Sequence, residues 1–110
     1  MNFYIGNSID EINEQDDNVE FSDDLLNSIY KLREKVSCDM SKLYEINPYS
    51  DIEVSKSNLF QIIEICKYIL NTSLLQDYKD LEENKQMLRD LIKISEKAIS
   101  KNLGLISIGD

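Results

Sequence analysis

The twelve residues from 59 to 70, LFQIIEICKYIL, decide the fold, because apolar side chains cover nearly the whole circumference of the helix that they would form. A helix that is apolar on most sides is surrounded by other elements of the protein. We therefore expect a central core helix that begins after a serine cap, at Ser55 or Ser57, and ends near Asn71. The run is too short and too often interrupted by polar residues to span a membrane.

Two more long helices are expected, one on each side of this segment in the sequence. The first covers residues 23–37, where Ser22 is suited to the N-cap and apolar residues recur every three or four positions. The second covers residues 81–101 and begins with a capping-box pattern. Short helices are predicted near residues 39–44 and 74–79.

The two ends of the chain have the composition of strands. Residues 2–5 (NFYI) and 105–108 (LISI) are rich in aromatic and branched side chains. We expect them to pair as a two-stranded ribbon that lies on the helices. Between the first two long helices, Tyr49, Ile52 and Val54 are expected to anchor a connecting loop.

The length of 110 residues is sufficient for one domain with one modest core. The predicted fold is mainly α: a small helical bundle of three main helices and one or two short ones, spanning residues 1–110, with the ribbon at the termini. The amino terminus lacks the basic start and apolar stretch of a secretory signal, so the cytoplasm is the expected compartment.

Residues 10–24, DEINEQDDNVEFSDD, concentrate the negative charge of the chain. No lysine or arginine precedes Lys31, so the first 30 residues carry −8 of the formal net charge of −9. Such a block attracts a cationic partner and repels nucleic acid and anionic membranes. We therefore predict a partner-binding role for its eight acidic side chains, which are Asp10, Glu11, Glu14, Asp16, Asp17, Glu20, Asp23 and Asp24.

The backbone of this acidic block is expected to be a loop with one helical turn, tethered to the body by Ile12, Val19 and Phe21. The other interpretation of the block is a solvated loop without a partner. Lysines and arginines recur every four residues between Lys85 and Lys101, but that spacing winds around a helix instead of lining one face. A complete set of internal partners for the block is therefore not expected.

Several classes of chemistry lack the residues that they need. The chain has no histidine, and its two cysteines, Cys38 and Cys66, have no CxxC spacing, which excludes the common zinc sites and any mechanism with a histidine base. The acidic block has no glycine and does not match a calcium loop. Paired-carboxylate catalysis needs a rigid cleft, for which this short chain has little room. We expect no enzyme activity, no cofactor and no metal.

Tyrosine is the other residue type of interest, because the chain has six tyrosines and no tryptophan. Tyrosine is enriched at recognition interfaces. Tyr30 and Tyr44 are nearest to the acidic block in sequence, although a place at the edge of the core is the simpler interpretation for both.

With the acidic front YIGNSIDEINEQDDNVEFSDD (residues 4–24), a helical body and the tail LGLISIGD (residues 103–110), the chain resembles small bacterial immunity proteins of toxin/immunity systems, including contact-dependent inhibition and polymorphic toxin systems. The resemblance implies one-to-one binding to a cognate protein toxin, often a basic nuclease, whose active site the acidic surface would occlude. It implies no nucleic-acid or membrane partner. Two alternatives remain: an acidic nucleic-acid mimic or adaptor that binds a basic host protein, and a structural oligomerisation domain.

Overall fold

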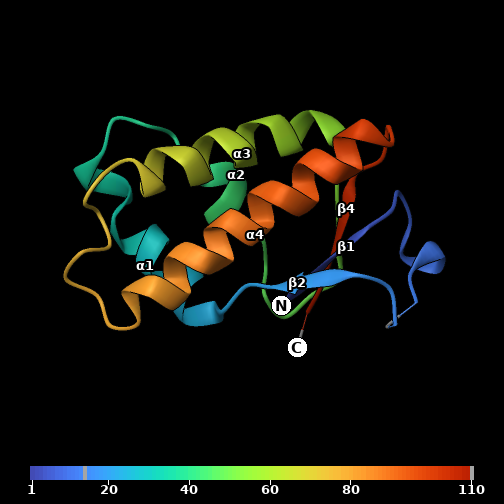
Figure 1. Cartoon of the computed structure of the whole chain (residues 1–110), viewed down its shortest axis with the longest axis horizontal. Helices are drawn as coiled ribbons and strands as arrows, with labels where there is room; N and C mark the ends of the chain where they lie inside the picture. Colours follow the sequence, from blue (N-terminus) through green and yellow to red (C-terminus); the bar gives the residue numbers. More distant parts are fainter. Residues whose placement is uncertain (14, 110) are drawn as a thin grey trace.

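A four-stranded antiparallel sheet forms one side of the molecule (Figure 1). The structure is a computed structural model that describes residues 1–13 and 15–109. The strand order is β2-β1-β4-β3, so the first and last strands of the chain occupy the middle of the sheet. The strands are β1 (Asn2–Ile5), β2 (Asn18–Glu20), β3 (Ile52–Val54) and β4 (Leu105–Ile108).

This sheet shows that the prediction of a mainly α bundle was wrong. The terminal strands do pair, with Asn2 opposite Ile108 and Ile5 opposite Leu105. Each of them also takes a second partner, β2 on one side and β3 on the other, so the ribbon is the centre of a real sheet. The fold is therefore a mixed one, in which helices pack on an antiparallel sheet.

The two longest helices are close to the predicted ones. They are α3 (Lys56–Leu70) and α4 (Leu81–Ser100). The Ser55 hydroxyl accepts a hydrogen bond from the backbone N–H of Asn58 at 3.3 Å, as expected for an N-cap. The positions predicted for both long helices in the second half of the chain are confirmed, but the capping box predicted at the start of α4 is not, because Asp80 makes no side-chain cap hydrogen bond.

The other helices are α1 (Asp23–Lys31), α2 (Ser41–Tyr44) and two 3-10 turns, η1 (Ile9–Glu11) and η2 (Arg33–Lys35). Among them, α2 confirms the short helix predicted near residues 39–44, whereas the rest differ more from the prediction. Helix α1 therefore ends six residues before the predicted residue 37. Residues 74–79 form turns where a short helix was expected.

The core lies between the helices and the inner face of the sheet. Helix α3 packs along α4, and α4 packs on β1 and β2 (Figure 1). Phe3, Phe21 and Leu105 are completely buried there. The central-helix prediction holds for most of α3, but Phe60 is 53% exposed, so one side of this helix faces solvent.

The two cysteines are free thiols. Cys66 lies within the buried side of α3, and desolvation raises the pKa of its thiol to about 12. A neutral, buried thiol of this kind is a packing group and a poor nucleophile.

The outer face of the sheet is covered in part by the segment that follows β1. Tyr4 and Ile106 face each other across β1 and β4 and are buried on this side. A Cβ atom on Gly6 would lie 3.3 Å from Cδ1 of Ile12 and 3.7 Å from Cγ1 of Ile106, which places Ile12 against the same face. The acidic block thus begins as a cover for the outer face.

None of the helices in the described ranges combines the length and the hydropathy that a membrane span requires.

Candidate protein-binding surface

The acidic block follows one edge of the molecule, because its middle residues form the edge strand β2 (Figure 1). In the figure it runs from the η1 turn, along β2, to the start of α1. The predicted helical turn is present as η1, but the prediction missed the strand. Exposed side chains belong to Asp10, Glu11, Asp16, Asp17, Glu20 and Asp24, whereas Asp23 is 39% exposed and Glu14 lies outside the described residues.

Apart from Glu20, which lies on β2 between them, the described carboxylates of the block form two groups. We call Asp10, Glu11, Asp16 and Asp17 the acidic loop; the other group is Asp23 and Asp24 at the start of α1. Residues 18–22 are extended between them, and at about 3.3 Å per residue they separate the two groups by roughly 20 Å. The block is therefore continuous in sequence but has two centres in space.

The acidic loop is organised by hydrogen bonds of its own. The Ser8 hydroxyl accepts from the backbone N–H of Asp10 at 3.3 Å and caps η1. Oδ2 of Asp16 accepts from the backbone N–H of Asn13 at 3.1 Å. The Asn18 amide donates to the Asp16 carbonyl at 3.0 Å and so joins the loop to β2. These bonds give the loop a defined shape while its carboxylates stay in solvent.

Internal cations neutralise little of the acidic loop. Lys97 approaches Asp17 at 3.5 Å, but the two side chains are 50% and 91% exposed. An ion pair that is so open to solvent contributes about 0–1 kcal/mol to stability. The acidic loop therefore keeps most of its negative field.

The second group of carboxylates lies at a helix N-terminus. The Ser22 hydroxyl accepts from the backbone N–H of Leu25 at 3.1 Å, which confirms the predicted cap of α1. Carboxylates in this first turn are favoured by the helix dipole. Oδ1 of Asp23 lies 3.9 Å from the amino-terminal nitrogen of Met1, whereas Asp24 is exposed.

Three tyrosines gather beside this second group and form a surface hollow of about 430 Å³. The rings of Tyr30 and Tyr44 meet edge to face, with 5.3 Å between their centroids. Tyr49 stands at the rim and is 73% exposed. We call this the tyrosine hollow; it is lined by Asp23, Asp24, Leu26, Asn27, Tyr30, Tyr44, Pro48 and Tyr49.

Tyr49 is the candidate contact residue that the sequence interpretation missed. It was expected to anchor a connecting loop, and it is instead an exposed large hydrophobic residue. The excess of tyrosine over tryptophan was the available signal, but proximity in sequence favoured only Tyr30 and Tyr44.

The turn that carries Tyr49 is held firmly in place. Oδ1 of Asn47 accepts from the backbone N–H of Tyr49 at 2.9 Å. The backbone N–H of Gly109 donates to Oδ1 of Asp51 at 3.0 Å, which ties the turn to the end of β4. A Cβ on Gly109 would come within 2.5 Å of the Ser50 nitrogen, so the contact needs glycine. Because the backbone of the turn is already ordered, little backbone entropy would be lost if the exposed ring bound another molecule.

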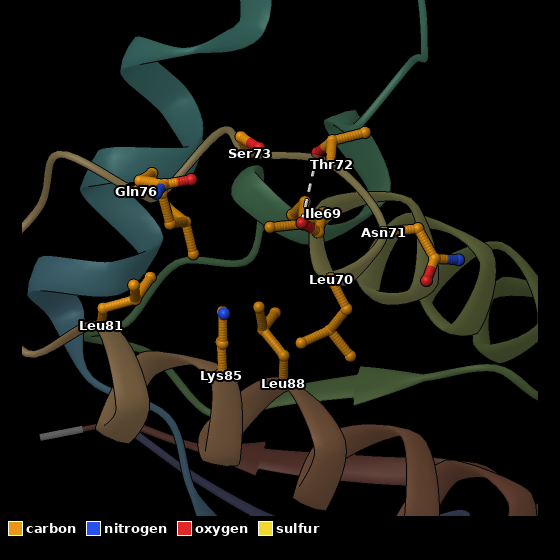
Figure 2. A pocket seen from close by; sticks show the side chains of 10 residues that line it. Ile69, Leu70, Asn71, Thr72, Ser73, Gln76, Leu81, Lys85 and Leu88 are labelled. Carbon is orange, nitrogen blue, oxygen red and sulfur yellow. Dashed lines mark hydrogen bonds between the residues drawn. The ribbon is translucent and has the colours of Figure 1, made fainter.

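A separate hollow of about 270 Å³ lies between the end of α3 and the start of α4 (Figure 2). The Lys85 nitrogen points into it, between Leu81 and Leu88. The Thr72 hydroxyl donates to the Ile69 carbonyl at 3.2 Å and is thus already satisfied. No residue of the acidic block lines this hollow, and its volume is below the usual range of about 300–1,000 Å³ for ligand pockets.

Within the described ranges, no group of three or more histidine, cysteine, aspartate or glutamate residues is arranged to hold a metal ion. No family model, curated protein or solved structure matches this chain. The surface is therefore interpreted from its own chemistry.

Proposed function

We propose that this protein is a small binding module that neutralises a basic protein partner, in the manner of an immunity protein that inhibits a cognate toxin domain. The observation that carries the proposal is the position of the acidic block along one edge of the molecule, which we call the acidic edge. Its exposed carboxylates follow η1, β2 and the start of α1, and the Asp17 ion pair compensates them only weakly. The tyrosine hollow at one end of this edge supplies aromatic contact area.

The two parts of the surface suit two steps of binding. Carboxylates in solvent act over a Debye length of about 8–10 Å and accelerate the encounter with a basic surface. Buried aromatic contacts then slow dissociation, because interface energy concentrates in a few residues such as tyrosine. A nuclease that binds phosphates with lysine and arginine would offer the matching surface. The acidic edge would then occupy the site of the nucleic acid.

The direct test is inhibition of a toxin domain encoded beside the gene for this protein. We expect a one-to-one complex in which nuclease activity falls linearly to zero at equimolar protein, and an association rate that decreases as salt increases. A stable mixture in which the nuclease keeps its full activity, or no complex at all, would contradict the proposal.

Two further measurements distinguish the proposed inhibitor from a nucleic-acid mimic and from an oligomerisation domain. A nucleic-acid mimic would compete with DNA or RNA for several unrelated basic proteins, so such proteins are included in the binding assay. An oligomerisation domain would show a mass of more than one chain at low concentration in analytical ultracentrifugation. The proposed inhibitor instead shows the mass of one chain and prefers one partner.

A further inference from the structure

The tyrosine hollow combines the two kinds of group that attract an organic cation. Tyr30, Tyr44 and Tyr49 contribute aromatic rings, and Asp23 and Asp24 contribute carboxylates. No lysine or arginine is among the described residues that line it. We propose that this hollow is an arginine-binding site, which receives one arginine side chain of the protein partner. The inference rests on the proposed function only for the source of that arginine.

The chain itself already places a guanidinium on one of these rings. The central carbon of the Arg33 guanidinium lies 3.7 Å from the centroid of Tyr30. Its Nη1 also donates to the Tyr30 carbonyl at 2.8 Å, which holds it there. Arg33 does not line the hollow, so it leaves the rings of Tyr44 and Tyr49 to a cation from outside.

The charges around the hollow favour an incoming cation. Asp24 is exposed beside the rings. Asp23 is oriented partly toward the amino terminus, with Oδ1 buried at 3.9 Å from the Met1 nitrogen. The basic residues on the helices that line the hollow are Lys31 on α1 and Lys42 on α2. Lys31 lines a neighbouring hollow that shares Asp24 and Asn27 with this one, Lys42 lines another, and neither is among the described residues that line the tyrosine hollow. A cation in the hollow therefore meets carboxylates first.

Arginine fits this chemistry better than lysine does. A guanidinium is planar and weakly hydrated, so it stacks on tyrosine while its N–H groups donate to a carboxylate. An ammonium must lose a tighter hydration shell for fewer fixed contacts. Since the Tyr49 turn is held by Asn47 and Asp51, the site needs little rearrangement to accept a flat group.

The test uses a blocked glycyl-arginyl-glycine peptide and needs no toxin. Nuclear magnetic resonance would follow the tyrosine ring signals and the backbone amides during titration into the whole protein. We expect saturable shifts centred on Tyr30, Tyr44 and Tyr49, with a dissociation constant in the millimolar range. The same peptide with citrulline, which has nearly the shape of arginine but no charge, should bind at least tenfold more weakly, and the lysine peptide several-fold more weakly.

Matched variants test separately whether binding depends on the Tyr49 ring, on the Asp24 charge or on a change in the fold. Tyr49→Phe keeps the ring and should bind the arginine peptide within about twofold of the unchanged protein, whereas Tyr49→Leu should bind about tenfold more weakly. Phe60→Leu changes another exposed aromatic residue and should have no effect. Asp24→Asn should weaken binding several-fold, and Asp10→Asn, the same charge change in the acidic loop, should not. Amide spectra of each variant check that the fold is retained.

Three results would overturn the inference: equal binding of the citrulline or lysine peptide, shifts spread equally over the acidic loop, or full binding by Tyr49→Leu.

Failure of the arginine site is distinguishable from failure of the proposed function. A protein that inhibits a toxin while its hollow ignores arginine would lose only the arginine site. A hollow that binds arginine in a protein that inhibits no neighbouring toxin would lose only the inhibitor role.

Discussion

The two ends of the acidic block contain the same residue types but offer a partner different things. In the acidic loop, carboxylates stand in solvent, and Asp17 has a weak contact with Lys97. At the start of α1, carboxylates share a hollow with three tyrosines. In the proposed complex, the first arrangement would act at a distance through its field, and the second would act on contact. We call the acidic loop the steering end and the start of α1 with the tyrosine hollow the holding end. The count of charges in the sequence does not distinguish the two; the neighbours of each carboxylate do.

The largest effect is expected at the holding end. Tyr49→Ala should weaken the complex with the partner by about 2–3 kcal/mol, mainly through faster dissociation, because it removes a central aromatic contact. Surface plasmon resonance would give both rate constants. The control is Phe60→Ala, which removes a ring of similar exposure on α3. If Tyr49→Ala changed only the association rate, the division into two roles would fail.

A smaller effect is expected at the steering end. Reversing the charge of Asp10, Glu11 and Asp17 to lysine should slow association about tenfold at low salt and flatten its salt dependence, with little change in dissociation. Stopped-flow kinetics at several ionic strengths would measure it. Reversal of three exposed acids elsewhere is the control for net charge, namely Glu64, Glu82 and Glu96. A control that slows association equally would show that the position of the charge is unimportant.

A third change tests whether the two ends are independent. Gly109→Ala should push the Tyr49 turn out of place, since its Cβ would lie 2.5 Å from the Ser50 nitrogen. We expect a loss of about 1 kcal/mol in both folding stability and affinity, as for other overpacked contacts. Urea unfolding and amide spectra would measure it. Amide shifts confined to residues 47–51 and their neighbours would show that the two groups of carboxylates are independent, whereas equal shifts in the acidic loop would contradict that independence.

The smallest effect is expected for Lys97→Met. Loss of its exposed contact with Asp17 should change the free energy of unfolding by less than about 0.5 kcal/mol. The freed carboxylate should slightly raise the association rate with a basic partner. A large loss of stability in thermal unfolding would mean that the acidic loop is held to α4 by this pair, and that its charge serves the fold.

The parts of the fold that sequence patterns predicted are those set by local periodicity. Helices α3 and α4 have long apolar repeats, and serine precedes both α1 and α3. The strands β2 and β3 have three residues each, which is too short for an alternating pattern to appear. Their conformation comes from pairing with β1 and β4, which lie far away in sequence. The prediction of a mainly α fold was wrong because pairing between distant strands leaves no pattern in a short stretch of sequence.

The candidate site was also predicted only in part. The acidic residues were visible as a block, because charge needs no structure to be counted. The tyrosine hollow was not, since Tyr30 and Tyr49 come from different elements and meet only after α1 and the turn before β3 have packed. The prediction for Tyr49 failed because an aromatic residue after a proline has no sequence feature that tells an anchor from an exposed contact.

The placement of the terminal strands at the centre of the sheet also sets the order of assembly. Strand β1 cannot gain its partner β4 until residue 105 has been made, so a growing chain leaves one side of β1 without hydrogen bonds. Closing so long a loop is entropically costly, and folds rich in distant contacts form slowly. The α3–α4 hairpin, by contrast, joins neighbours in sequence. We therefore expect a folding chain that holds the α3–α4 helical hairpin before it has a complete sheet.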